Sequence, residues 1–173
     1  MSKTQPSKTI LYASDLGKHM RPVFRRAIAM AECSQAQIIM LHVVEPLTTS
    51  GMAIVESYLP KAQYEKFASE GLRSMLEQMR KRVARFCEDE TGSCPADSDL
   101  VADVLVENGQ PGIEIPRMAQ KLGVDMIVMG SCSRSLLGQG LLGSTARRVT
   151  QSSKVPVLVV PNCQAGKKKK KNA

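Results

Sequence analysis

The sequence predicts an α/β domain built on a doubly wound parallel sheet, with helices on both faces. Five short runs rich in apolar or β-branched residues alternate with helical patterns along the chain. Several of these runs are apolar at consecutive positions, which is typical of strands that are covered on both sides. Alternating strands and helices favour parallel pairing through right-handed crossovers, so we expect a single five-stranded parallel sheet.

The predicted strands are residues 9–13 (TILYA), 37–44 (QIIMLHVV), 100–107 (LVADVLVE), 126–129 (MIVM) and 155–160 (VPVLVV). Between them, apolar residues at spacings of three and four predict helices over 20–31, from 60 to about 90, around Ile115 and Ala119, and over 143–153. Pro116 fits the third of these helices only in its first turn, and Gly123 ends that helix.

At 173 residues the chain is long enough to bury a core without a metal or a disulfide. We expect one domain over residues 8–163, a flexible N-terminus at 1–7 and a disordered Lys-rich tail at 164–173. The 45–59 connection is long for this architecture, and a lid, an interface and a mobile loop all remain open for it. Aromatic residues make up only 3% of the chain, so the core is expected to be aliphatic and rich in Met.

The N-terminus has no apolar signal segment, and no run approaches the ~20 apolar residues of a membrane span, so we predict a cytoplasmic protein without a membrane contact. Five scattered cysteines are expected to be reduced thiols. Of the net charge of +8, five charges come from residues 167–171. This tail is predicted to be solvated; contact with nucleic acid or anionic lipid is the less favoured alternative, because no aromatic residues accompany it.

The most informative segment lies between residues 125 and 161, where a strand, a Gly- and Ser-rich loop, a helix and a strand follow each other. Gly143, Ser144 and Thr145 open the helix. Unpaired backbone N–H groups and a positive partial charge at such a start favour an anion, so the segment predicts a phosphate-binding site. In parallel sheets ligands bind beyond the carboxyl ends of the strands, which here are residues 14–15, 43–45 and 129–133.

Other chemistries have less support. The literal G-x-G-x-x-G at 138–143 starts eight residues beyond the nearest strand end and lacks a following acidic residue, so it is not a dinucleotide fingerprint. Only two histidines are present and no nucleophile elbow accompanies them, which disfavours acyl transfer. His42 is expected to be a hydrogen-bonded core histidine. No acidic cluster indicates a metal site of the protein itself, although a bound triphosphate would bring Mg²⁺.

Gly130, two residues, Ser133, nine residues, and then Gly143 with Ser144 form a spaced motif, and the segments ILYASDLG, LHVVE, NGQPGIEIPRMAQKLGVDMIVMG and KVPVLVVP accompany it. In these features the chain resembles the universal stress protein family. The resemblance implies an adenine-nucleotide alpha-hydrolase-like sheet with strand order 3-2-1-4-5. It also implies a homodimer that pairs the last strand, from Val155 to Val160.

The resemblance further implies a site of nine residues for ATP, either alone or together with Mg²⁺. Asp15, beside Ser14 at the first strand end, would contact the nucleoside, and Val43 would meet the adenine through its backbone. Met129 and Gly130 would line the ribose side. The phosphates would be held by Ser133, Gly143, Ser144 and Thr145. An alternative for Asp15 is a simple cap of the following helix. Cys132 is expected to be a passive loop residue, with a redox role as the alternative.

Ser133 departs from the family motif, which has a second glycine at this position. If the position needs a positive φ, a side chain costs about 1 to 2 kcal/mol, which weakens binding roughly five- to thirtyfold. The serine hydroxyl can offset part of this by donating to a phosphate. The first hypothesis is therefore an ATP-binding sensor or switch of the stress response, and the second is a nucleotide-free dimeric scaffold that recruits protein partners. A third, weaker hypothesis is slow ATP hydrolysis or self-phosphorylation on Ser144 or Thr145.

Overall fold

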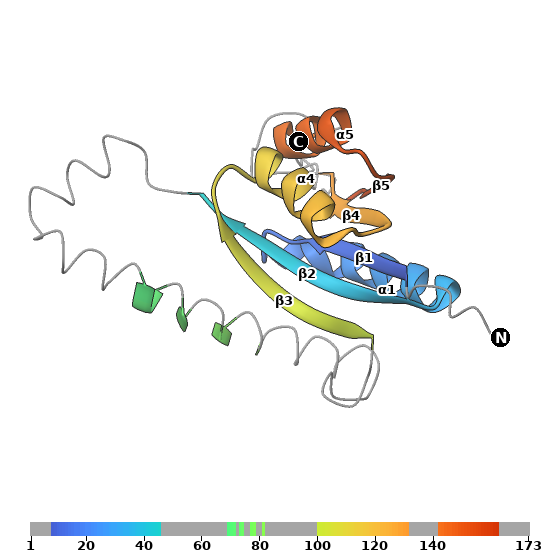
Figure 1. Ribbon diagram of the computed structural model, residues 1–173, viewed down its shortest axis with the longest axis horizontal. Helices are drawn as coiled ribbons and strands as arrows, with labels where there is room; N and C mark the ends of the chain where they lie inside the picture. Colours follow the sequence, from blue (N-terminus) through green and yellow to red (C-terminus); the bar gives the residue numbers. More distant parts are fainter. Residues whose placement is uncertain are drawn as a thin grey trace, which may run out of the picture.

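The computed structural model describes residues 8–45, 69–71, 73–74, 77–78, 81, 100–131 and 142–162 (Figure 1). Several predictions fall outside these residues: both tails, the connection from 46 to 59, most of the helix expected from 60 to 90, Cys132 and Ser133. The described residues of that long helix, between 69 and 81, are helical.

Five parallel strands form one sheet in the order β3-β2-β1-β4-β5. The strands are β1 (Lys8–Ala13), β2 (Ala36–Val44), β3 (Val101–Asn108), β4 (Met126–Gly130) and β5 (Val157–Val160). The central strand β1 pairs with β2 on one side and with β4 on the other. From β1 to β3 the strands are therefore added on one side of β1, and β4 and β5 are added on its other side. The predicted fold class and strand order are confirmed.

The last strand is shorter than predicted, because it begins at Val157 instead of Val155. Val155 is held in a turn by Ser153: its N–H donates to the Ser153 hydroxyl at 3.2 Å, and that hydroxyl donates to the Val155 carbonyl at 2.8 Å. Pro156 has no N–H for the ladder, although its carbonyl accepts the N–H of Ile127 at 2.9 Å. Regular pairing with β4 thus starts only after the proline.

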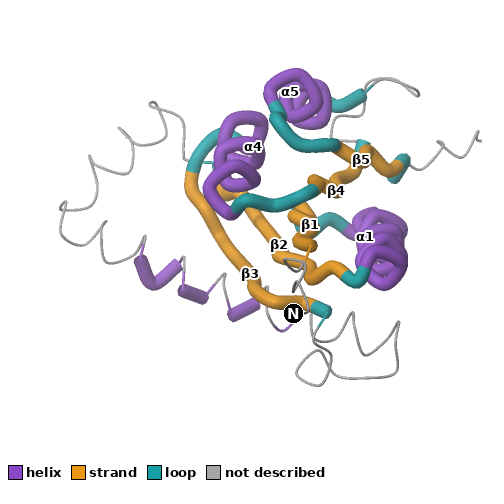
Figure 2. Tube along the Cα trace, turned by 45° about the vertical axis from the view of Figure 1, so that its right-hand side comes forward, coloured by secondary structure: helices purple, strands orange, loops and turns teal. Residues whose placement is uncertain are grey.

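Helices cover both faces of the sheet (Figure 2). Helix α1 (Arg21–Ser34), preceded by the short 3₁₀ helix η1 (Lys18–Met20), packs on one face, and α4 (Pro111–Leu122) with α5 (Ser144–Ser152) packs on the other. Two left-handed residues end the longer helices, Gln35 with φ of 51° after α1 and Gly123 with φ of 64° after α4. A left-handed residue after the last turn caps a helix by donating its N–H to an earlier carbonyl.

The prediction for Pro116 was wrong, because the structure places it at the sixth residue of α4 instead of in the first turn. Pro111 occupies the start of this helix, where its fixed φ suits the first turn, so the helix begins earlier than the apolar pattern around Ile115 suggested. Pro116 removes one backbone hydrogen bond in the second turn. The buried side chains of Ile115, Met118 and Ala119 compensate by packing against the sheet.

Alternation along β1 divides the core into two clusters. Ile10 and Tyr12 face α1, whereas Leu11 and Ala13 face α4 and α5. On the α1 face the rings of Tyr12 and Phe24 lie with their centroids 5.0 Å apart. The opposite cluster contains no aromatic residue among its described members, as the aliphatic composition predicted.

Candidate functional site

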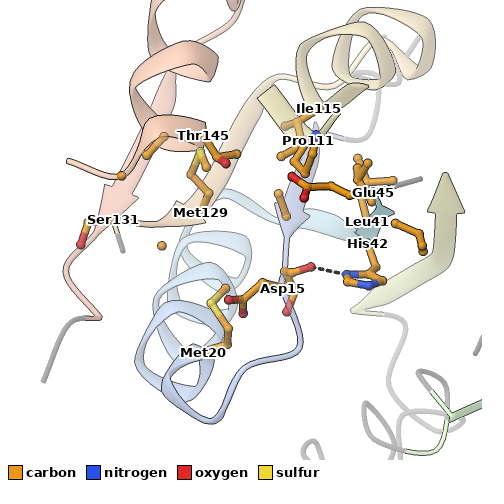
Figure 3. A pocket seen from close by; sticks show the side chains of 17 residues that line it. Asp15, Met20, Leu41, His42, Glu45, Pro111, Ile115, Met129, Ser131 and Thr145 are labelled. Carbon is orange, nitrogen blue, oxygen red and sulfur yellow. Dashed lines mark hydrogen bonds between the residues drawn. The ribbon is translucent and has the colours of Figure 1, made fainter. Parts of the chain in front are cut away.

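A cavity of about 490 Å³ lies where the carboxyl ends of β1, β2 and β4 meet the starts of α4 and α5 (Figure 3). Parallel strands bring their carboxyl ends to the same edge of the sheet, so residues far apart in sequence gather there. The lining residues are Ala13, Ser14, Asp15, Met20, Leu41, His42, Val43, Val44, Glu45, Pro111, Ile115, Met129, Gly130, Ser131, Gly143, Thr145 and Ala146.

The turn after β1 is fixed by two side chains that accept hydrogen bonds from its backbone. The Ser14 hydroxyl accepts the N–H of Leu16 at 3.1 Å, and the Asp15 carboxylate accepts the N–H of Gly17 at 2.7 Å. Leu16 has a φ of 59°, a left-handed value that non-glycine residues rarely adopt. The alternative of a helix cap for Asp15 is wrong, because Gly17 is the N-cap of η1 and no side chain caps that helix. The Asp15 carboxylate closes the turn instead, and it also borders the cavity.

His42 joins β2 to this turn. Its Nδ1 lies 2.8 Å from the carbonyl oxygen of Ser14, and because a carbonyl only accepts, Nδ1 carries the proton in this hydrogen bond. The imidazole is half-buried instead of lying deep in the core, and it lines the cavity. The expected hydrogen bond of His42 is thus found, with a place beside the site that the sequence did not indicate.

The segment between β4 and α5 is closed at its base by backbone hydrogen bonds. The N–H of Ser131 donates to the Val160 carbonyl at 2.9 Å, and the N–H of Gly143 donates to the Ser131 carbonyl at 2.8 Å. Helix α5 starts with no side-chain cap at Gly143, and Thr145 in its first turn borders the cavity. The first turn of α5, where backbone N–H groups and the positive end of the helix dipole favour an anion, thus lies at the border of the cavity without a side-chain cap.

Seven of the nine predicted site residues line the cavity together: Ser14, Asp15, Val43, Met129, Gly130, Gly143 and Thr145. Ser144 is exposed in the first turn of α5, and Ser133 lies outside the described residues. The N–H predicted as a phosphate donor at Gly143 is engaged by Ser131, so the donors at this end are those of the following residues. The roles of these residues toward a ligand stay predictions.

Sequence reasoning missed several lining residues, among them Met20, Pro111, Ile115 and Ala146. Pro111 lies three residues beyond the end of β3, and a helix start soon after a strand end is the signal that could have indicated it. Ile115 and Ala146 looked like ordinary core residues, and both are indeed buried. A residue of the core and a residue that lines the cavity show the same apolar spacing in the sequence when the cavity is a continuation of the core.

The charges around the cavity are unevenly distributed. Asp15 and Glu45 are acidic, and no Lys or Arg occurs among the described lining residues. Figure 3 shows Ser131, Met129 and Thr145 on one side, with Leu41, His42 and Glu45 on the other. One side of the cavity thus carries the hydroxyls of Ser131 and Thr145, and the other carries the Glu45 carboxylate beside apolar side chains.

Within the described ranges, no three His, Cys, Asp or Glu side chains are grouped so that they could hold a metal ion. Behind the cavity, burial raises the pKa of the Tyr12 phenol above its usual range, so this group stays neutral. No helix in the part of the chain that the structure describes is long and apolar enough to cross a membrane.

The sequence model of the universal stress protein family matches residues 6–161, which is most of the chain. The chain belongs to the universal stress protein family. This universal stress protein is 28% identical to Universal stress protein MJ0577 of Methanocaldococcus jannaschii over 153 residues, which span 88% of this chain and 94% of that relative. It is 30% identical to Universal stress protein YxiE of Bacillus subtilis over 139 residues, which span 78% of this chain and 85% of that relative.

Solved structures show the same fold. The structure of hypothetical protein MJ0577 superimposes with a TM-score of 0.65 at 24% identity, over 91% of this universal stress protein and 98% of that chain. A universal stress protein in complex with cAMP superimposes with a TM-score of 0.55 at 18% identity, over 92% of this chain and all of that one (100%). Both superpositions support the five-stranded parallel α/β fold.

Proposed function

We propose that this universal stress protein binds ATP or a related adenine nucleotide in the cavity and acts as a sensor or switch in the stress response. One observation carries the proposal: a cavity of about 490 Å³ lies between the uncapped start of α5 and the carboxyl ends of the central strands. Cavities of this size suit a small ligand, and an open helix start favours its anionic part.

The distribution of charge orients the ligand. Phosphates belong near α5, where the amides of Ser144 and Thr145 and the Thr145 hydroxyl can donate, and away from the carboxylates of Asp15 and Glu45. A ribose has hydroxyl donors that suit a carboxylate such as Asp15. The base then lies among apolar side chains near Val43 and Ile115. A relative of the same fold was solved in complex with cAMP, which supports an adenine compound as the ligand.

The lining residues favour holding a nucleotide over turning it over. The lining residues that could activate water, Asp15, His42 and Glu45, come from the ends of β1 and β2, whereas Ser131, Gly143 and Thr145 belong to the segment from β4 to α5. Mg²⁺ would arrive with the triphosphate and be held mainly by it. Slow hydrolysis, or phosphorylation of Ser144 or Thr145, remains the weaker part of the proposal.

A homodimer is part of the proposed function. β5 pairs with β4 on one side only, and all four of its side chains are half-buried. An edge strand presents backbone donors and acceptors to a second strand, and the apolar side chains from Val157 to Val160 suit a buried contact. Val155, two residues before them, lies in the turn. We place this dimer in the cytoplasm.

A nucleotide-free scaffold that recruits protein partners is the second candidate. Two observations favour it: Ser133 stands at a motif glycine, and the Gly143 N–H already has a partner in the Ser131 carbonyl. Both weaken the phosphate end of the site. A scaffold would keep the fold and the edge strand but would not respond to ATP.

A thermal-shift measurement with Mg-ATP distinguishes the two, once the purified protein has been tested for nucleotide that is already bound. At ATP a hundredfold above Kd, binding adds about 2.7 kcal/mol and raises Tm by ~5 to 11 °C for a chain of this size. Mg-GTP at the same concentration is the matched control and should shift Tm less. No shift with Mg-ATP, in protein free of nucleotide, would favour the scaffold.

A further inference from the structure

Asn162, two residues beyond β5, is one of the two buried polar residues in the described part of the chain, with 9% of its surface exposed. A buried amide is costly unless its oxygen and nitrogen find partners, so its contacts indicate what it holds in place. Asn162 does not line the cavity, but Met20, Gly130 and Ser131, which contact it, all do.

The amide of Asn162 reaches both walls of the cavity. Its Nδ2 lies 3.4 Å from the sulfur of Met20, the last residue of η1, which follows the turn that carries Asp15. Its Oδ1 accepts a long hydrogen bond of 3.5 Å from the Ser131 hydroxyl, beyond the end of β4. A single buried side chain therefore bridges the wall that follows β1 and the wall that follows β4.

The same amide explains why residue 130 has no side chain. A Cβ built on Gly130 would lie 2.5 Å from Nδ2, 2.8 Å from Cγ and 2.9 Å from Oδ1 of Asn162. These separations are well inside van der Waals contact, and all three atoms belong to one buried side chain that has little room to move. Gly130 adopts no positive φ, so space is the requirement at this position.

We propose that Asn162 is a positioning residue for the cavity, and that Gly130 is a glycine in this chain because the Asn162 amide fills the place of its side chain. The proposal rests on the proposed nucleotide site. The Ser131 carbonyl accepts the Gly143 N–H at 2.8 Å, so the position of Ser131 sets the start of α5. Asn162 thus acts on the phosphate end of the site through Ser131.

The test is a size-complementation series, in which the affinity for ATP and for adenosine is measured by calorimetry. Asn162→Ala should weaken ATP about three- to tenfold and adenosine less than twofold, because the phosphate end loses its support. Gly130→Ala should weaken ATP at least about tenfold, since its Cβ meets the amide. The double variant should return to the level of Asn162→Ala, because all three clashing atoms are then gone.

Asn108→Ala is the matched control, since Asn108 is an exposed asparagine at the end of β3 that does not line the cavity. It should change neither affinity. A double variant as weak as Gly130→Ala would overturn the proposal, because Gly130 would then be needed by the ligand or the backbone. An unchanged ATP-to-adenosine ratio in Asn162→Ala would also overturn it, since general destabilisation does not alter ligand selectivity in folded molecules.

Urea unfolding separates this proposal from the proposed function. If the wild type binds no ATP, the nucleotide site fails, but Gly130→Ala should still lower the urea midpoint by ~0.5 to 1 M and the double variant should recover most of that loss. No recovery would overturn the steric pairing by itself. Should Gly130→Ala not fold alone, a folded double variant is the recovery. Should Asn162→Ala not fold, Asn162→Gly, which also lacks all three clashing atoms, replaces it in every arm.

Discussion

The α1 face of the sheet carries a closed core from Ala36 at the start of β2 to Met20 near the strand ends, whereas the α4 and α5 face opens into the cavity. The core residues that line the cavity come from the second face, apart from Met20. They are Ala13, Leu41, Val43, Ile115, Met129 and Ala146. The comparison shows that most core residues of the α1 face contribute only to packing. On the α4 and α5 face, several core residues both pack in the core and line the proposed ligand cavity.

The largest expected effect breaks the closed face. Phe24→Ala removes a ring that is 3% exposed and lies 5.0 Å from Tyr12, so it should lower the free energy of unfolding by about 3 to 5 kcal/mol. Urea unfolding measures the loss. ATP affinity below the unfolding range should be unchanged, and a tenfold weaker affinity would show that the two faces are not independent.

The next effect is on the open face. Asp15→Ala should weaken ATP about 10- to 150-fold, because a charge-assisted hydrogen bond contributes about 1.5 to 3 kcal/mol. Calorimetry measures the change. The control is Asp125→Ala: Asp125 also follows a turn and accepts a backbone N–H, from Thr9 at 2.8 Å, but at the other end of β1. Equal losses in the two variants would contradict a ligand role for Asp15.

A third, pH-dependent effect belongs to the closed face. The folded protein raises the pKa of Tyr12, so above the unfolded pKa of about 10 the unfolded chain loses a proton that the folded chain keeps. Stability is therefore complete below pH 10 and falls above it, by up to about 1.4 kcal/mol per pH unit from this group. In Tyr12→Phe the free energy of unfolding, measured with urea, should fall less steeply between pH 10 and 11 than in the wild type. An identical dependence on pH would exclude Tyr12 as the cause.

The smallest effect concerns ligand selectivity on the open face. The exposed Glu45 carboxylate borders the cavity beside the apolar side chains, and a carboxylate can accept from the amino group of adenine but not from the carbonyl of hypoxanthine. Glu45→Gln should therefore reduce the preference for ATP over inosine triphosphate by about two- to tenfold. Competition binding measures the ratio. A preference that stays constant would place the base away from Glu45.

The sequence was sufficient for the sheet, because its strands are nearly continuous apolar runs and its helices have clear apolar faces. It failed where local signals conflicted. The apolar spacing around Ile115 and Ala119 predicts a helix with Pro116 in its first turn, whereas α4 already begins at Pro111. At β5 the apolar run included Val155 and Pro156, although a proline cannot donate to the ladder.

The candidate site was predicted in part for a similar reason. Residues such as Asp15 and Gly143 stand at strand ends or helix starts, where sequence position alone indicates the edge of the sheet. Asn162 carried no such signal, since a single asparagine after the last strand looks like a solvent-exposed turn residue. Its burial, and its steric relation to Gly130, arise from contacts between segments that are distant in the chain.

The hydrogen bond between the Gly143 N–H and the Ser131 carbonyl holds together the two ends of the eleven-residue connection 132–142 between β4 and α5. Because both ends are held by the end of β4 and the start of α5, changes of composition or length between residues 132 and 142 need not disturb the strands or the helix. We therefore expect this stretch to behave as an exchangeable cassette. Grafting it between homologues should transfer ligand preference while the host keeps its own melting behaviour.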